Sequence, residues 1–102
     1  MSDPRKILSP DQIDEALPTG WQRAGEAIRV EFATGDFATG LRLVNLIGAS
    51  AEAADHHPDL TLTYPTVTVT LSSHDVGGVT GRDIDLARRV SGHAGELGVG
   101  PA

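Results

Sequence analysis

The sequence contains no cysteine and few aromatic side chains, and both absences narrow what it can do. Without cysteine the chain cannot form disulfides, thiolate nucleophiles or zinc–thiolate sites. Aromatic residues make up 4% of the 102 positions, so aliphatic side chains must fill most of a modest core. The hydrophobic fraction of 39% is typical of a folded domain. We therefore expect a single domain over residues 1–102, with flexible tails at 1–6 and 92–102.

Basic residues and long apolar runs are also scarce. The chain has 8 lysine and arginine residues against 14 acidic ones, which gives a formal net charge of −6. An acidic chain without a run of basic residues repels phosphate backbones, so we expect no nucleic-acid partner. No apolar stretch approaches the roughly 20 residues that span a bilayer, and no signal-peptide core is visible near the N-terminus. These features predict a cytoplasmic protein without a membrane partner.

What the chain does contain is a regular succession of helix and strand signals. A capping box over residues 9–12, with a proline at its second position, predicts a short first helix. Alternating apolar and polar residues predict a strand at 27–33, with a shorter hairpin partner at 21–24. Asp36 is expected to cap a longer helix, because apolar residues then recur at helical spacing as far as about Ala54.

The second half of the sequence repeats this succession. Apolar residues alternate with threonines at 60–64 and, with changed parity after Pro65, at 66–72, which predicts two further strands. Thr80 is expected to cap a last helix that ends near Val90. The order is helix, two strands, helix, two strands, helix. It predicts an α+β fold in which helices cover one face of an antiparallel sheet.

Three of the four histidines, His56, His57 and His74, lie in or beside the ends of predicted elements. A single loop histidine is usually an ordinary surface residue, and two adjacent ones after a helix can act as its C-terminal cations. An imidazole can also donate or accept a proton near neutral pH. Asp83 has two interpretations as well. It stands three residues after Thr80, where an acidic side chain completes a capping box, and it could instead orient a histidine.

One spaced set of residues is more specific than any histidine pair. Its members, in chain order, are Glu52, His56, His57, Pro58, Tyr64, His74 and Asp83. This set resembles the signature of the pterin-4a-carbinolamine dehydratase family, whose members also serve as dimerisation cofactors. The similarity covers roughly Ile7 to Val90 and includes the Gly20-Trp21 pair. One departure is Leu60, which stands where many family members carry a tryptophan that either lines the pterin or packs.

The resemblance implies a four-stranded antiparallel sheet with three helices packed on one face. It implies dehydration of 4a-hydroxytetrahydropterin to quinonoid dihydropterin, which recycles the pterin cofactor of aromatic amino-acid hydroxylases without a metal or a cofactor. The catalytic residues that it implies are His56, His57, His74 and Asp83. The substrate-binding residues that it implies are Asp55, His56, His57, Ser72, Ser73, His74 and Asp75. Dehydration needs one proton delivered to a departing hydroxyl and another removed from a ring nitrogen, and imidazoles can do both.

Two other functions fit parts of the sequence. A non-catalytic binding or dimerisation module could use the same fold, but the retention of three histidines and Asp83 argues against it. A histidine metal site is disfavoured, because the adjacent His56 and His57 cannot easily converge on one ion. We also expect a homodimer or higher homo-oligomer. The Gly/Ala-rich face of the helix at 36–54 or an open sheet edge would supply the contact.

Overall fold

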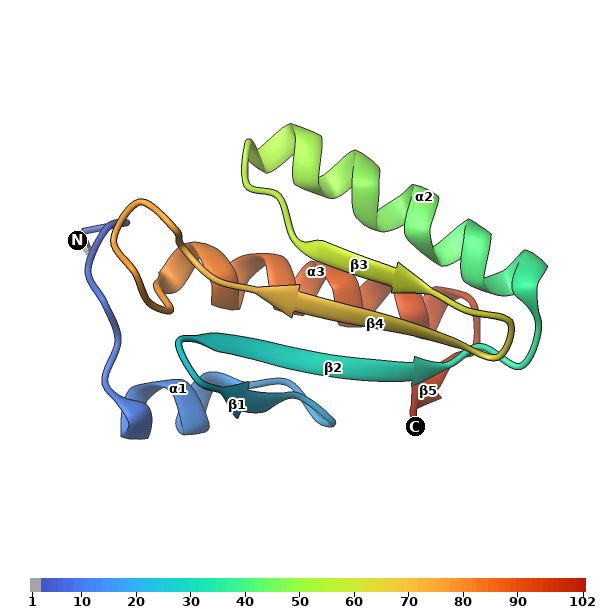
Figure 1. Ribbon diagram of the computed structural model, residues 1–102, viewed down its shortest axis with the longest axis horizontal. Coiled ribbons are helices and arrows are strands. Elements are labelled where there is room, and N and C mark those ends of the chain that lie inside the picture. Colours follow the sequence, from blue (N-terminus) through green and yellow to red (C-terminus); the bar gives the residue numbers. More distant parts are fainter. Residues whose placement is uncertain (1–2) are drawn as a thin grey trace.

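The computed structural model describes residues 3–102, which form an α+β fold with one antiparallel sheet (Figure 1). The elements are α1 (Pro10–Ala16), β1 (Gln22–Ala24), β2 (Ala27–Ala33), α2 (Phe37–Ala54), β3 (Asp59–Leu62), β4 (Thr66–Leu71), α3 (Gly81–Glu96) and β5 (Gly100–Pro101). The predicted fold class and the predicted order of the first seven elements are confirmed. The sheet differs from the prediction in one respect, because the short strand β5 pairs with β2 as a fifth member.

The sheet has the strand order β1-β2-β4-β3, so β2 and β4 occupy its centre. Their register places apolar residues directly opposite each other, in the pairs Ile28–Leu71, Val30–Val69 and Phe32–Val67. All six side chains are buried. Because alternate residues of a strand face opposite sides, the threonines of β4 form the other, polar face. Leu60 lies opposite Val69 and packs against the core, so its position serves packing.

All three helices add side chains to this single core. The largest contributions are Ile13 from α1, Leu43 and Ile47 from α2, and Ile84, Leu86 and Val90 from α3. In Figure 1, α3 lies behind β4 and α2 lies beside β3. Gly40 explains how α2 approaches the sheet: a Cβ there would lie 2.6 Å from Cδ1 of Leu62. Gly48 has no such neighbour within 4 Å, so the helix surface there carries no side chain and contacts nothing.

Three predicted helix caps are present. The Ser9 side chain accepts from Gln12 N–H, and the Gln12 side chain accepts from Ser9 N–H. Oδ1 of Asp36 accepts from the backbone N–H of Thr39 at 2.7 Å, and this hydrogen bond lowers the pKa of Asp36. The Thr80 side chain accepts from Arg82 N–H at the start of α3, and the Asp83 side chain accepts from Thr80 N–H. None of the helices within residues 3–102 is both long and apolar enough to cross a membrane.

The C-terminal segment corrects one prediction. Helix α3 runs past Val90 to Glu96, and Gly100–Pro101 then pairs with the end of β2, so helix and strand replace most of the expected flexible tail at 92–102. Burial explains the difference, because Ala94 lies in the core and its carbonyl accepts from Val99 N–H at 2.8 Å. Tertiary packing here outweighs the low helix propensity of glycine.

The N-terminal segment is likewise attached to the domain. Residues 1 and 2 of the expected tail lie outside the described residues. From Asp3 onward the chain makes a turn, in which Lys6 N–H donates to the carbonyl of Asp3, and Leu8 N–H donates to the carbonyl of Val79 at 2.8 Å. This contact holds the segment against the loop that precedes α3.

Candidate functional site

The site begins where α2 ends, at Asp55. This residue has a left-handed backbone, with φ of 50°, and aspartate is one of the few residues other than glycine that adopts it readily. The resulting turn lets the N–H of His56 donate to the carbonyl of Ala51 at 3.1 Å. His56 therefore leaves the helix and approaches the start of α3. Asp55, which the resemblance places in substrate binding, also has this conformational role.

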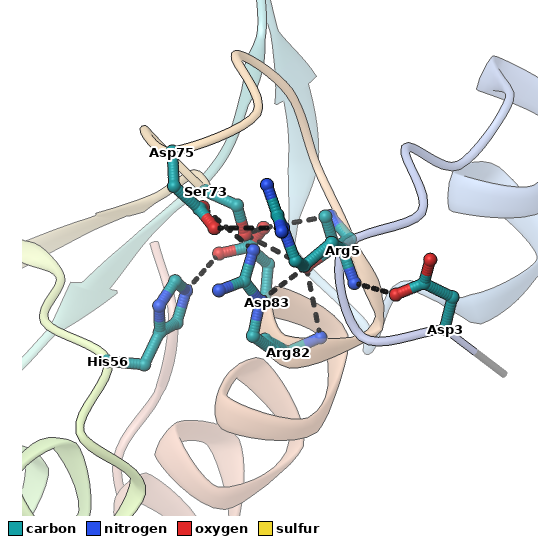
Figure 2. Close-up of polar contacts among 8 residues, drawn as sticks. Asp3, Arg5, His56, Ser73, Asp75, Arg82 and Asp83 are labelled. Carbon is teal, nitrogen blue, oxygen red and sulfur yellow. Dashed lines mark hydrogen bonds and ion pairs between the residues drawn. The ribbon is translucent and has the colours of Figure 1, made fainter.

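The His56 imidazole contacts Asp83 in the first turn of α3 (Figure 2). Nε2 of His56 lies 2.5 Å from Oδ1 of Asp83, and the two side chains are 11% and 0% exposed. An ionised carboxylate can only accept hydrogen bonds, so Nε2 of His56 must carry the hydrogen. In the neutral ring Nδ1 is then the nitrogen with a free lone pair.

The second carboxylate oxygen of Asp83 is held by two other donors. Oδ2 accepts from the Ser73 hydroxyl at 2.8 Å and from Thr80 N–H at 2.9 Å. Because Ser73 uses its single hydrogen in this bond, the Thr80 hydroxyl must donate to Oγ of Ser73, which lies 2.8 Å away. All three side chains are buried. Their polar atoms form a satisfied network, which fixes the position of the carboxylate.

Asp83 makes both of the contacts that the two sequence-based interpretations require. One carboxylate oxygen completes the capping box with Thr80, and the other pairs with His56. The cap orients the carboxylate, and the carboxylate orients the imidazole. A single substitution at Asp83 therefore affects both the helix start and the histidine.

The loop between β4 and α3 is tied to this corner by charged groups. Nη2 of Arg82 donates to Oδ1 of Asp75 at 2.8 Å, and Nε of Arg5 lies 3.9 Å from Oδ2 of the same carboxylate (Figure 2). The Arg82 hydrogen bond lowers the pKa of Asp75. Ser73 also pairs with Gly78 across the loop. The loop that carries His74 and Asp75 is thus fixed at its base and clamped at Asp75.

The structure does not bring every predicted site residue into this network. It joins His56, Ser73 and Asp83 directly, and it links Asp75 to Thr80 through Arg82. The remaining predicted residues, Asp55, His57, Ser72 and His74, have no side-chain hydrogen bond to it among residues 3–102. Nε2 of His57 instead makes a short contact with Oε2 of Glu52, and both side chains are exposed.

A cleft beside His56 is lined in part by charged residues that the sequence analysis did not identify as site residues, among them Arg82 and Arg89. It has a volume of about 200 Å³, and its lining residues are Ala54, His56, Arg82, Asp85, Leu86 and Arg89. Arg82 and Arg89 are seven residues apart, or about two helical turns, so they share one face of α3. This spacing is the signal in the sequence from which the pair of arginines could have been identified. A larger hollow of about 590 Å³, between α1 and β1, contains none of the predicted site residues.

Metal ligands are not clustered in the described part of the chain. Within residues 3–102 no three histidine, aspartate or glutamate side chains are gathered closely enough to hold a metal ion. The groups that can act chemically at this corner are therefore imidazoles, carboxylates, hydroxyls and guanidinium groups. They can transfer protons and bind polar or anionic parts of a ligand.

Comparison with known proteins identifies the family. A family profile described as Pterin 4 alpha carbinolamine dehydratase matches residues 6–93. A Mycobacterium avium (strain 104) protein named for this dehydratase is 41% identical over 91 residues, covering 87% of this chain and 97% of its own. A Nocardia farcinica (strain IFM 10152) protein with the same name is 44% identical over 87 residues, covering 83% and 92%.

Solved structures show the same likeness. A transcriptional coactivator/pterin dehydratase from Brucella melitensis has a TM-score of 0.82 and 36% identity, covering 87% of this chain and 99% of its own. A pterin dehydratase-like protein identified as a RuBisCO assembly factor in the alpha-carboxysome has a TM-score of 0.61 at 22% identity, covering 74% and 87%, and shares the fold. The chain belongs to the pterin-4a-carbinolamine dehydratase family.

Proposed function

We propose that this protein dehydrates 4a-hydroxytetrahydropterin to quinonoid dihydropterin and so takes part in pterin cofactor recycling. The observation that carries the proposal is the imidazole of His56, which Asp83 holds in one tautomer beside an open cleft. Membership of the dehydratase family supplies the substrate class. The fixed imidazole supplies a group suited to the proton transfers that dehydration requires.

Dehydration breaks the bond between C4a and its hydroxyl and forms a double bond from that carbon to a ring nitrogen. The leaving oxygen takes up one proton and departs as water, while the ring nitrogen loses one proton. His56 is the base in our proposal, because its Nε2–H is committed to Asp83 and its Nδ1 can accept. The acid comes from one of the exposed imidazoles, His57 or His74. In this arrangement Asp83 is a positioning residue.

The test is turnover of synthetic 4a-hydroxytetrahydropterin by the purified protein, compared with the uncatalysed reaction. We expect His56→Ala, and one of His57→Ala and His74→Ala, to lower kcat at least about tenfold, as loss of a general acid or base does. His93→Gln is the matched control, because His93 lies at the other end of α3 and contacts Ser50. Equal rates in all four variants would show that the histidines are not used.

A chelator test accompanies it. The reaction as proposed uses side-chain proton transfer, so prolonged dialysis against a chelator should leave turnover unchanged. Loss of activity that one divalent ion restores would contradict the mechanism.

The second candidate is a non-catalytic binding or dimerisation module. The Brucella melitensis relative carries both names, transcriptional coactivator and pterin dehydratase, which supports considering the two roles for this chain. Turnover that does not exceed the uncatalysed rate, in a protein that still binds dihydropterin, would favour this candidate.

We also propose that the protein forms a homo-oligomer. Phe37 and Leu41 of α2 are 49% and 45% exposed, and β3 is an edge strand with one unpaired side. An exposed strand edge can pair with another chain, and a patch of exposed apolar side chains marks an interaction site. Light scattering at micromolar concentration should give at least the mass of a dimer, and a monomer would overturn this proposal.

A further inference from the structure

The cleft beside His56, which we call the arginine cleft, is lined by Ala54, His56, Arg82, Asp85, Leu86 and Arg89. Its volume of about 200 Å³ lies below the roughly 300–1,000 Å³ of a complete ligand site, so it fits part of a ligand. At about 30 Å³ per water molecule it has room for about six or seven, which is enough for a short side chain and its terminal group.

The charge of the arginine cleft is opposite to that of the whole chain. Two guanidinium groups and one carboxylate line it, whereas the chain carries a formal net charge of −6. Arg82 is held in place, because Nη2 donates to Asp75 and Nε donates to Oγ1 of Thr80. Arg89 and Asp85 make no ion pair within the described residues and keep their hydrogen-bonding groups for a ligand.

The arrangement of these groups selects a ligand class. A guanidinium group matches the oxygens of a phosphate with two parallel hydrogen bonds. Arg82 and Arg89 stand about 10 Å apart along one helix face, and Asp85, which also lines the cleft, stands between them along the helix. A carboxylate there repels a bare polyphosphate but accepts hydrogen bonds from hydroxyl groups. The lining thus suits a chain of hydroxyl groups that ends in a phosphate.

We propose that the arginine cleft binds the side chain of the substrate, and that the preferred substrate is a pterin whose polyol side chain carries a phosphate group. This inference rests on the proposed function, because His56 forms one wall of the cleft and would face the pterin ring. Arg89 binds the phosphate, and Asp85 accepts from the hydroxyls. Arg89 is a specificity residue and takes no part in proton transfer.

The test compares a phosphorylated 4a-hydroxytetrahydropterin with its dephosphorylated counterpart in the wild-type protein, Arg89→Gln and Arg88→Gln. Arg88 is the matched control, because it is the adjacent exposed arginine and does not line the cleft. We expect kcat/KM to favour the phosphorylated substrate by about tenfold, as one charge-assisted contact provides. Arg89→Gln should remove the preference by lowering kcat/KM for the phosphorylated substrate, and Arg88→Gln should keep it.

A binding measurement separates this inference from the proposed reaction. The affinities of a phosphorylated dihydropterin, its neutral counterpart and inorganic pyrophosphate are measured by fluorescence or calorimetry, which needs no turnover. Tighter binding of the phosphorylated pterin that depends on Arg89 supports the cleft even if the protein is inactive. Equal affinity for both pterins overturns the inference. Arg89-dependent binding of pyrophosphate alone also overturns it, because the cleft would then hold a free anion.

Discussion

Helices α2 and α3 are joined by two histidine contacts, one at each end of α3, and the two contacts differ in their partners. At one end His56, just after α2, pairs with Asp83 at the start of α3. At the other, Nε2 of His93 lies 2.7 Å from the hydroxyl of Ser50 on α2. Both contacts hold the same two helices together, and His56 also lines a cleft.

The partner atoms explain why the two ends suit different tasks. Asp83 is a carboxylate held by three hydrogen bonds from its neighbours, so it imposes one tautomer on His56. A serine hydroxyl can donate or accept, so Ser50 imposes no tautomer on His93. Nδ1 of His93 is buried without a hydrogen-bond partner within residues 3–102, and Glu96 lies 3.9 Å from it. In our proposal the His56 end serves proton transfer, whereas the His93 end is a helix contact.

Asp83→Ala should produce the largest loss of stability at either end. It removes the capping acceptor and leaves the Ser73 hydroxyl and Thr80 N–H without their acceptor in the interior. We expect the free energy of unfolding to fall by about 3 kcal/mol, as for other buried charged contacts that lose one partner. Urea denaturation measures it. A loss below that of a simple cap, about 1 kcal/mol, would mean that the network contributes little.

Asp83→Asn should separate the cap from the orientation of His56. The amide oxygen can still accept from Ser73 and Thr80, so the loss of stability should be about 1 kcal/mol. Its NH₂ group would then face Nε2 of His56, which must accept, so the imidazole hydrogen moves to Nδ1 and the proposed base is blocked.

We therefore expect kcat to fall at least about tenfold in Asp83→Asn while the melting temperature falls by only about 5 °C. Nitrogen-15 NMR of the His56 ring should report the change of tautomer. An unchanged tautomer and a normal rate in this variant would show that Asp83 serves only as a helix cap.

Ser50→Ala applies the corresponding test to the His93 end. The substitution leaves Nε2 of His93 without its partner in a half-buried position, so stability should fall by about 1 kcal/mol. Turnover should be unchanged, because no residue of the His56 network contacts either side chain. Thermal denaturation together with the dehydratase assay checks both expectations. A fall in kcat with this substitution would contradict the division between the two ends.

The same comparison shows which features can be predicted from sequence. Local signals located the caps at Ser9, Asp36 and Thr80, because a cap depends on residues within one turn. The contact between His56 and Asp83 joins residues 27 positions apart, and no local pattern encodes it. The spaced family signature contained both residues but did not indicate which histidine Asp83 would contact.

The His93 end was harder to predict for the same reason. Glycines after Ser91 suggested a flexible tail, whereas the burial of Ala94 and the contact of His93 with Ser50 hold the helix in place. The arginine cleft also depends on tertiary structure, because α3 supplies its guanidinium groups and the end of α2 supplies the opposite wall.

The smallest expected effect concerns the loop at the His56 end, which is clamped by Asp75. The Arg82 hydrogen bond lowers the pKa of Asp75 in the folded protein below its ordinary value of 3.8. The folded state therefore binds this proton less readily than the unfolded state, so the clamp stabilises the fold above pH 3.8 and loses its effect as the pH falls through the lowered pKa.

Asp75→Asn should flatten this part of the acid-unfolding curve and leave stability near neutral pH slightly reduced. The effect is small because both side chains are partly exposed and solvent screens the pair. Denaturation midpoints measured from neutral pH to below 3.8 test it, with Asp85→Asn as the control, since Asp85 has no ion pair within the described residues. If both variants give the same pH curve, the Asp75–Arg82 contact does not hold the loop in solution, and the position of His74 must depend on the backbone hydrogen bonds of Ser73 to Val76, Gly77 and Gly78.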